Sequence, residues 1–328
     1  MVAKRDWLTR HADHLRRALL LEPRGHADLC GALLTEPVLP GSHAGILFMH
    51  NGGYSAIRGH GVIAATTIAL ERGLIMPGGD GVTIVYDTPA GTVRALATMV
   101  GSGISATGAK SVRTGAVSRD LKALPVRVSS VSYSSVPSFV LLGGLRVAIG
   151  SRQIRADVAF GGEFYAIIDG ESVAVPVEPS HLAELRRVGV EIAAAIEQSH
   201  AIVHPIDPGI RGVAGVVLTG PARASGADLR SLTVYADGTI DRSPCGAGTA
   251  AVMAVLEAMG LLSERKAFVH EGLIGTCVTG RIAGRTAVGD VQAIVPNIEG
   301  SAWITGEHAF LMHDDDPLKR GVRLSGVC

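Results

Sequence analysis

The sequence predicts an α+β protein of two pseudo-symmetric lobes, each a curled, mostly antiparallel sheet around one central buried helix. An internal repeat is the first reason. Arg58-Gly59-His60-Gly61 leads into a helix-forming segment that closes at Gly73, and Cys245-Gly246-Ala247-Gly248 leads into another that closes at Gly260. The second reason is a succession of short apolar runs separated by glycines. The chain has 42 Gly in 328 residues, well above the usual share of about 7%, as expected of a strand-rich protein with many tight turns.

The first half of the chain predicts an N-terminal helix, several strands and one buried helix. Leu8, Ala12, Leu15 and Leu19 fall on one helical face, and the helix must end at or before Pro23 because the residue preceding a proline avoids helical geometry. The segment 62–72 is apolar almost all round, which predicts burial. Strands are expected at 32–34, 45–49, 82–87, 91–99 and 126–133.

The second half predicts more strands, one amphipathic helix from Leu182 to Ile196 and a second buried helix at 249–259. We expect the first lobe to span 1–152, completed by a C-terminal tail of about 306–328, and the second lobe to span 153–305. Further strands are expected at 138–142, 145–149, 153–160, 164–168, 212–218, 231–235, 278–282, 291–295 and 302–305.

Composition narrows the class of protein. The formal net charge is zero and aromatic residues make up 4%, so neither a nucleic acid nor a membrane surface is an expected partner. The N-terminal residues are polar and lack the apolar core of a signal peptide. Four widely spaced cysteines predict free thiols and a cytoplasmic location. The histidines and cysteines show no metal-ligand spacing, so no metal is expected.

The repeat predicts where a ligand binds. A helix N-terminus presents unpaired backbone N–H groups and the positive end of a dipole, and glycine lets a ligand approach that backbone closely. Two such ends facing one another would bind one small anion between two half-domains. The residue before each Gly-x-Gly, Arg58 in one half and Cys245 in the other, would point at the bound molecule.

Cys245 is the main candidate for chemistry. A cysteine at a helix N-terminus has its thiolate stabilised, which predicts a lowered thiol pKa. Pro244 sets an extended approach, and Asp241 could accept a hydrogen bond from a ligand ammonium. The alternative is that Cys245 is a small buried residue and Asp241 a helix cap. The Pro-Cys-Gly-x-Gly context and the repeat favour the functional interpretation.

Arg58 and His60 each have two interpretations. Arg58 is either a solvated surface charge or a guanidinium that binds a carboxylate with two hydrogen bonds. His60 either caps and packs the helix or contacts a substrate hydroxyl or amine and moves a proton. The sequence leaves both pairs of alternatives open.

At these residues the chain resembles the proline racemase family, and the likeness extends over nearly the whole sequence. The resemblance implies two lobes of the diaminopimelate-epimerase-like fold with the active site between them. It also implies α-proton abstraction from proline or a hydroxyproline without a cofactor. The motifs that carry it are Leu21–Asp28, Met49-His50-Asn51, Gly53-Tyr54, Gly59-His60-Gly61, Thr88-Pro89-Ala90-Gly91, Val136-Pro137-Ser138-Phe139, Gly161-Gly162 with Phe164-Tyr165, Asp241–Gly248 and Asp315-Asp316-Pro317.

The resemblance assigns roles to the two helix ends. Cys245 matches the second of the two thiols that racemases place on opposite faces of the α-carbon. Asp241 and His60 match groups that hold the ring amine. The remaining matches are backbone groups of the two helix ends at Gly59, Gly61, Gly246 and Gly248.

Three departures from the family pattern bear on the reaction. Arg58 stands where the family has its first cysteine or a serine, and a guanidinium with a pKa above 12 is a poor proton carrier. Ala247 replaces a usual threonine or serine. The N-terminal strand with its His-Thr motif is absent. Ser55 is a nearby hydroxyl, but it lies three residues from the expected position, so we do not expect it to substitute for the first thiol.

The segment from His50 to Ser55 and the Asp-Asp-Asp-Pro tail are most similar to the trans-3-hydroxy-L-proline dehydratase branch, so the expected activity is dehydration of a hydroxyproline, with Cys245 as acid–base group. The alternatives are a 4-hydroxyproline 2-epimerase or proline racemase, and an inactive homologue that binds an imino acid through Arg58. In each case the expected ligand is a small imino acid. A second copy of the chain is a candidate partner in a homodimer.

Overall fold

The computed structural model describes residues 1–76, 82–100, 127–263 and 266–323. The chain divides into two compact units. Unit 1 is Met1–Tyr133 with Gly300–Cys328, and unit 2 is Ser134–Glu299. The division falls at residue 133 rather than at the expected 152, because β7 (Phe139–Ile149) pairs along its length with β8 (Arg152–Phe160) and so belongs with the second unit.

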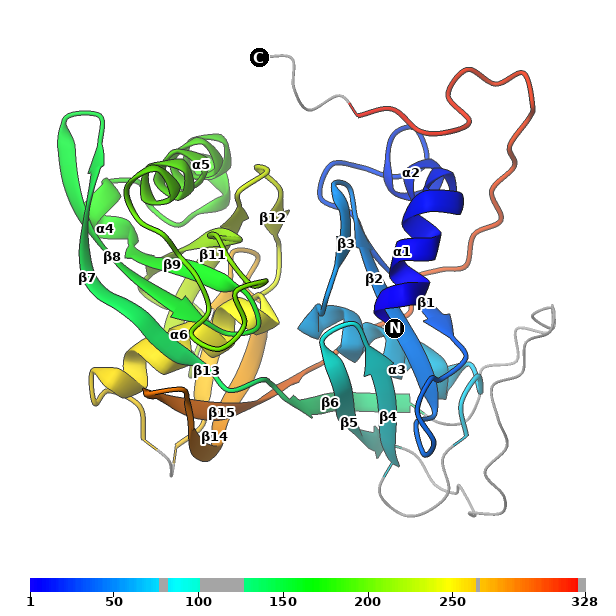
Figure 1. Ribbon diagram of the computed structural model, residues 1–328, viewed down its shortest axis with the longest axis horizontal. Coiled ribbons are helices and arrows are strands. Elements are labelled where there is room, and N and C mark those ends of the chain that lie inside the picture. The colour runs from blue at the N-terminus through cyan, green and yellow to red at the C-terminus, as the bar shows by residue number, and fades with distance from the viewer. Residues whose placement is uncertain (77–81, 101–126, 264–265, 324–328) are drawn as a thin grey trace. The chain divides into compact units, whose positions relative to one another are not determined.

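Unit 1 is a mixed sheet with one buried helix, α3 (Gly59–Glu71), packed against it (Figure 1). The strand order is β1-β2-β4-β5-β6, with β3 paired to β2. The β2–β4 pair is parallel and the other pairs are antiparallel. The other elements are α1 (Val2–His11), α2 (Asp13–Leu20), β1 (Cys30–Thr35), β2 (Ala44–His50), β3 (Gly53–Ser55), β4 (Val82–Thr88), β5 (Gly91–Val100) and β6 (Arg127–Ser134).

The N-terminal helix differs from the expectation. Two helices form, because the backbone leaves helical geometry at Ala12 (φ −134°). Leu15, assigned by periodicity to the buried face, is exposed, whereas Arg16 is buried. The buried face of α2 therefore carries a charged side chain whose hydrogen bonds a hydrophobic period does not reveal.

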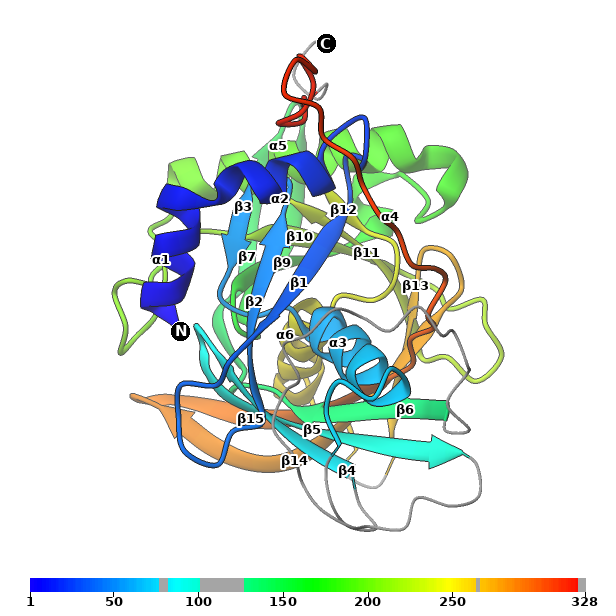
Figure 2. The same ribbon diagram turned by 90° about the vertical axis from the view of Figure 1, so that its right-hand side faces the viewer.

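The C-terminal tail returns to unit 1 as extended chain, in red in Figure 2. Val322 N–H donates to the Glu22 carbonyl at 2.8 Å, and the Arg24 guanidinium lies 3.1 Å from Asp316. No strand forms at 302–305, so that expectation is wrong. The tail is held by contacts with the segment after α2 rather than by a strand ladder.

Unit 2 is a long sheet that curls around α6 (Gly246–Ala258), in the order β15-β14-β13-β11-β10-β9-β8-β7. Ser138 and Ile294 exchange backbone hydrogen bonds at 2.7 and 2.9 Å, which brings the start of β7 to β15 at the other end of the order. The other elements are β9 (Phe164–Asp169), α4 (Gly170–Val173), η1 (Pro179–His181), α5 (Leu182–Ser199), β10 (Gly215–Gly220), β11 (Leu229–Tyr235), β12 (Ile240–Asp241), β13 (Phe268–Gly272), β14 (Cys277–Val288) and β15 (Val291–Gly300).

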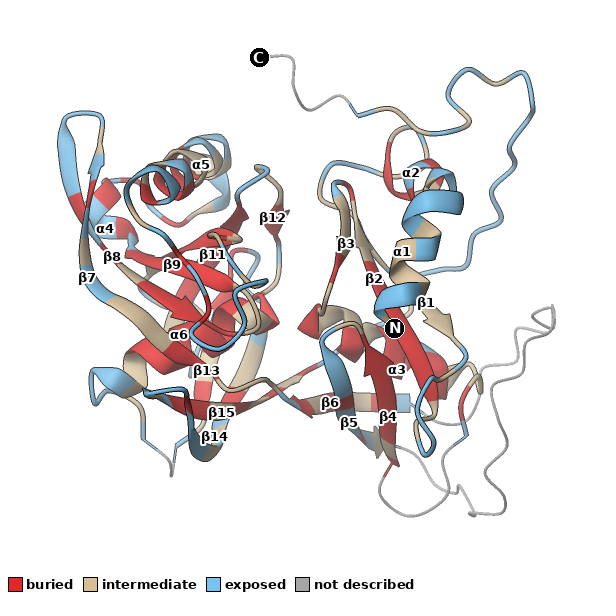
Figure 3. Ribbon diagram, in the orientation of Figure 1, coloured by how far each residue is buried: buried red, intermediate tan, exposed pale blue. Residues whose placement is uncertain are grey.

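The two faces of this sheet are covered by different helices. The amphipathic helix α5 packs Leu185, Ile192 and Ile196 on the sheet as part of a large core cluster, and these residues are fully buried. Helix α6 is apolar on nearly all sides and contacts β7, β8, β9 and β14. Figure 3 shows the buried residues gathered on the strands around it. The described helices include none long and apolar enough to cross a membrane.

The internal repeat is also a structural repeat. Helices α3 and α6 each have 13 residues and each begins at the first glycine of its Gly-x-Gly. Both are followed by a glycine with positive φ, 62° at Gly73 and 71° at Gly260, a conformation that glycine adopts without steric cost. The expected fold class, curled sheets each with a buried helix, is confirmed.

Candidate active site

Cys245 is the N-cap of α6. Its backbone is extended (φ −65°, ψ 129°), and its Sγ accepts a hydrogen bond from the Gly248 N–H at 3.3 Å. The Cys245 carbonyl accepts the first intrahelical bond from Thr249 N–H at 2.7 Å. The thiol thus takes the position that serine or aspartate usually occupies at a helix start, with a side chain only 4% exposed.

A glycine turn between β8 and β9 makes the closest approach to this helix end. A Cβ on Gly161 would lie 2.1 Å from the Ala247 carbonyl oxygen and 2.7 Å from the Ala251 nitrogen, both backbone atoms. No other residue fits there without moving the first turn of α6. The turn therefore sets the position of the helix N-terminus and leads directly into β9, which carries Tyr165.

Two tyrosines contact the thiol. The Tyr235 hydroxyl, at the end of β11, lies 3.4 Å from Cys245 Sγ, and the Tyr165 hydroxyl lies 3.7 Å from it. The two rings meet edge to face with centroids 6.5 Å apart. Sequence reasoning did not identify either tyrosine as a site residue. The sequence did contain a signal for each. Tyr165 lies near the start of β9, beside the glycine turn, and Tyr235 lies at the end of β11, beside the Asp241 segment.

Asp241 joins this cluster through Tyr235. It lies on β12, which pairs with β11, and its carboxylate accepts a hydrogen bond from the Tyr235 hydroxyl at 2.8 Å. Asp241 is 7% exposed. The structure therefore brings together the predicted pair Cys245 and Asp241, and it inserts a phenol between them.

The expected lowering of the Cys245 pKa is wrong. Burial, and after it the charge of the Asp241 carboxylate, raise the pKa of the Cys245 thiol to about 12. Hydrogen bonds with Tyr235, the Gly248 N–H and Tyr165 act in the opposite direction and do not compensate. A helix end lowers a thiol pKa when the sulfur is partly exposed, whereas here desolvation has the larger effect. Without a ligand, Cys245 is a neutral thiol.

His270 supports the same helix turn from inside the core. Its Nδ1 lies 2.8 Å from Thr249 Oγ1, and burial lowers the pKa of the ring to about 4. Nε2 is buried and has no hydrogen-bond partner among the described residues. We assign the neutral tautomer with Nδ1–H donating to Thr249, since a buried acceptor without a partner costs less than a buried donor. Sequence reasoning did not identify this residue.

In unit 1, Arg58 is the N-cap of α3 and is 9% exposed. Its Nε–H donates to Ser55 Oγ at 3.0 Å. The interpretation of Arg58 as a solvated charge is therefore wrong. Ser55, which sequence position led us to discount, contacts the residue that replaces the first cysteine. The short strand β3 folds back on β2 and brings residue 55 to the helix end.

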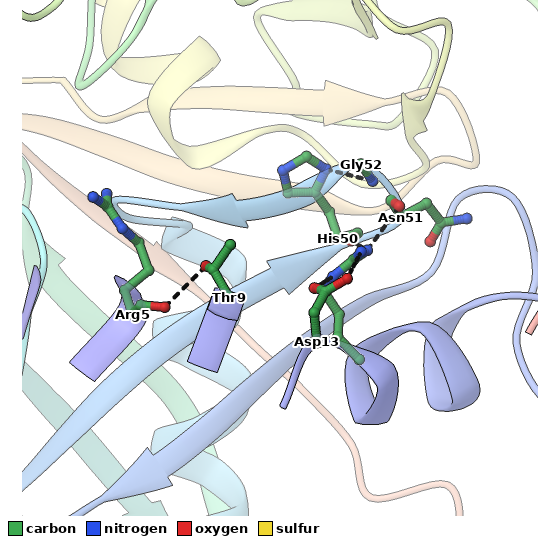
Figure 4. Close-up of polar contacts among 7 residues, drawn as sticks. Arg5, Thr9, Asp13, His50, Asn51 and Gly52 are labelled. Carbon is green, nitrogen blue, oxygen red and sulfur yellow. Dashed lines mark hydrogen bonds and ion pairs between the residues drawn. The ribbon is translucent and has the colours of Figure 1, made fainter. Parts of the chain in front are cut away.

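A buried arginine, Arg16, holds the turn that precedes Ser55. Figure 4 labels Asp13, His50, Asn51 and Gly52 of this network. Arg16 binds the Asp13 carboxylate with two hydrogen bonds, at 2.6 and 2.9 Å, and donates to the carbonyls of His50 and Asn51 at 2.7 Å each. The Gly52 N–H in turn donates to the His50 ring at 3.2 Å. A charged network therefore fixes the β2–β3 turn, which lies within the His50–Ser55 segment.

The other predicted residues lie in the first turns of the two helices. Gly59 is buried and His60 is half-buried at the start of α3, with Gly61 next to them. Gly246 and Gly248 are buried at the start of α6, and Ala247 is half-buried. Among the described residues no group of three or more His, Cys, Asp or Glu side chains is arranged to hold a metal ion.

Comparison with known proteins gives one consistent family. The family model described as "Proline racemase" matches residues 1–114 and 107–323. A trans-3-hydroxy-L-proline dehydratase of Bacillus cereus is 36% identical over 321 residues, which cover 98% of this chain and 89% of that protein. A proline racemase of Clostridioides difficile is 35% identical over 323 residues, with the same coverage.

The similar solved structures include proteins of the same kind. A hydroxyproline epimerase from Agrobacterium vitis, crystallised with bound trans-4-hydroxy-L-proline, matches with a TM-score of 0.81 and 30% identity. The match covers 99% of this chain and 87% of that one. The similar proteins are thus named as dehydratases, racemases and epimerases of proline or its hydroxy derivatives.

Proposed function

Because the chain belongs to the proline racemase family, we propose that it dehydrates trans-3-hydroxy-L-proline without a cofactor and that Cys245 is its acid–base group. Relatives that span 98% of the chain carry the name of this dehydratase. The observation that carries the proposal is the setting of Cys245, a buried thiol at an amide-rich helix end with the Asp241 carboxylate one phenol away.

The end of α6 offers a complementary group for each part of an imino acid. We propose that Asp241 binds the ring ammonium. Backbone N–H groups at Gly246, Ala247 and Gly248 are suited to a carboxylate, and they stabilise the negative charge that develops there when the α-proton is removed. The Cys245 sulfur accepts a hydrogen bond from the Gly248 N–H and so lies at the same end of α6.

The proposed reaction needs only one sulfur, which acts first as the base and then as the acid. The Cys245 thiolate takes the α-proton, and the electron pair of the C–H bond moves into the carboxylate as an enolate. The pair then returns to form the double bond between the α-carbon and C3 as the C3–O bond breaks. The leaving hydroxide takes the proton from the thiol and departs as water, which regenerates the thiolate. The enamine product then tautomerises to a cyclic imine.

Arg58 favours elimination over inversion. Inversion of a stereocentre needs a proton donor on the face opposite the base, and a guanidinium does not release its proton near neutral pH. Arg58 can instead bind a carboxylate, and we propose that role for it, with Gly59, His60 and Gly61 as further binding groups of the same helix end.

The direct test is incubation of the purified protein with trans-3-hydroxy-L-proline, trans-4-hydroxy-L-proline and L-proline. Imine formation from the first substrate supports the dehydratase. A change of optical rotation with the second or third would assign an epimerase or racemase instead. Thermal stabilisation by any of the three without turnover would assign an inactive imino-acid-binding homologue.

The role of Cys245 is tested by Cys245→Ala, with Cys277→Ala as the matched control because Cys277 is an exposed free thiol. We expect Cys245→Ala to lower kcat by at least about a hundredfold, the usual range for loss of a general acid–base group, and Cys277→Ala to leave kcat unchanged. Full activity in folded Cys245→Ala would exclude the proposed chemistry.

A further inference from the structure

Two tyrosine–carboxylate pairs surround the Cys245 sulfur. The Tyr235 hydroxyl donates to Asp241 at 2.8 Å, and the Tyr165 hydroxyl donates to Glu163 at 3.1 Å. Both phenol oxygens lie near Sγ, at 3.4 and 3.7 Å. Each hydroxyl proton is thus directed to a carboxylate, so the single S–H proton can be donated to one or the other phenol oxygen.

A hydroxyl has one proton and can give it to one acceptor at a time. While Tyr235 donates to Asp241, it cannot donate to the sulfur at the same time, so its stabilisation of a thiolate is incomplete. If another donor satisfies Asp241, the Tyr235 O–H is released to rotate toward Sγ, where it stabilises a thiolate. Hydrogen bonding to the charged form of a group lowers its pKa.

We propose that Tyr235 is a positioning residue that links occupancy of Asp241 by the substrate ammonium to ionisation of Cys245. This inference rests on the proposed function, which places the ring ammonium at Asp241. Binding of the cation offsets the carboxylate charge and takes over its hydrogen bond. Tyr235 then donates to Sγ, and the thiol proton leaves to solvent. The base is therefore formed only when an imino acid is bound.

Among the described residues of unit 2, the charged and titratable groups around Sγ come from three elements and one turn. They are Tyr235 on β11, Asp241 on β12, Tyr165 on β9, and Glu163 in the β8–β9 turn behind Tyr165. Tyr235 contacts both the sulfur and the carboxylate proposed to bind the ammonium. The Tyr165 hydroxyl is hydrogen-bonded to Glu163 instead, so loss of this hydroxyl is a matched comparison for loss of the Tyr235 hydroxyl.

The experiment measures the ultraviolet absorbance of the Cys245 thiolate as the difference between the wild-type protein and Cys245→Ser. Titrations are made without ligand, with L-proline, and with tetrahydrofuran-2-carboxylate, which has the same carboxylate on a five-membered ring with oxygen in place of the ammonium nitrogen. Calorimetry establishes saturation by both compounds. The set is repeated in Tyr235→Phe and Tyr165→Phe, each of which keeps its ring and loses only the hydroxyl.

With L-proline we expect the wild-type thiol pKa to fall by about two units, a hundredfold gain in thiolate fraction, and tetrahydrofuran-2-carboxylate to cause no fall. Tyr235→Phe should lose at least half of the fall, and Tyr165→Phe should keep it. An equal fall in Tyr235→Phe and wild type, or no fall in a wild-type protein saturated with L-proline, would overturn the inference and leave the proposed function standing. Failure of every imino acid to bind or react would overturn the proposed function itself.

Discussion

Acidification from about pH 7 to about pH 4 should loosen the second unit through one buried imidazole, His270. The side chain is 1% exposed, and burial lowers the pKa of the ring to about 4. Its Nδ1–H is committed to Thr249 Oγ1 at 2.8 Å, and Nε2 lies buried without a partner among the described residues. Protonation would place a charge and an unmatched N–H inside the packing around α6.

The sign and size of this effect follow from the two pKa values. The unfolded ring titrates near 6.5 and the folded ring near 4, so the unfolded state binds the proton first as the pH falls. The stability contribution is complete above pH 6.5 and is lost as the pH falls toward 4. At about 1.4 kcal/mol for each pKa unit, the full loss is about 3 kcal/mol.

The assay must report on the second unit. Both tryptophans, Trp7 and Trp303, belong to unit 1, so tryptophan fluorescence would follow the wrong part of the chain. Hydrogen–deuterium exchange of peptides covering 246–258, measured across this pH range in dilute urea, reports directly on α6. The comparison variant is His270→Gln, whose amide can still donate to Thr249 but does not titrate.

We expect wild-type α6 to lose protection more steeply with acid than His270→Gln does, and the difference between the two to approach 3 kcal/mol near pH 4. Carboxylates titrate in both proteins and cancel in the difference. His200, half-buried at the C-terminal end of α5, gives a control, since His200→Gln should follow the wild-type curve. Parallel curves for wild type and His270→Gln would refute the reasoning.

Two further outcomes test the helix ends. Arg58→Cys should raise the rate of L-proline inversion by at least about tenfold, because a thiol can exchange a proton near neutral pH and a guanidinium cannot; polarimetry of a folded variant that shows no gain would mean that Arg58 does not limit inversion. Gly161→Ala should lower kcat by at least about tenfold and destabilise the protein by about 2 kcal/mol, since its Cβ would overlap backbone atoms of α6. Gly284→Ala, where a Cβ has open space, should change neither, and equal effects in the two variants would contradict the packing argument.

Much of the fold was predictable because its signals are local. The two buried helices were located by glycines at both ends and by apolar residues on every side. The strands were located by short apolar runs. The boundary between the units was misplaced, because the pairing of β7 with β8 is a matter of register that no single segment encodes. The strand expected at 302–305 is absent for the same reason, since apolar residues there have no partner strand.

The candidate site was predictable only in part. Cys245, Asp241 and Arg58 stand in recognisable patterns, and the structure gives each of them a buried position. Tyr235, Tyr165, Ser55 and His270 act through contacts between segments far apart in the sequence or folded back on one another. The direction of the Cys245 pKa shift was wrong because a helix-end rule takes no account of burial, which is known only from the packed structure.

The burial of Cys245 has a consequence for the lifetime of the enzyme under oxidising conditions. Peroxides react with thiolates, and each oxidation step beyond the sulfenic acid is hard or impossible to reverse. A sulfur that is 4% exposed and remains protonated at physiological pH reacts slowly with such oxidants. The idle protein should therefore tolerate peroxide, and its vulnerability should be confined to the interval in which a substrate occupies it.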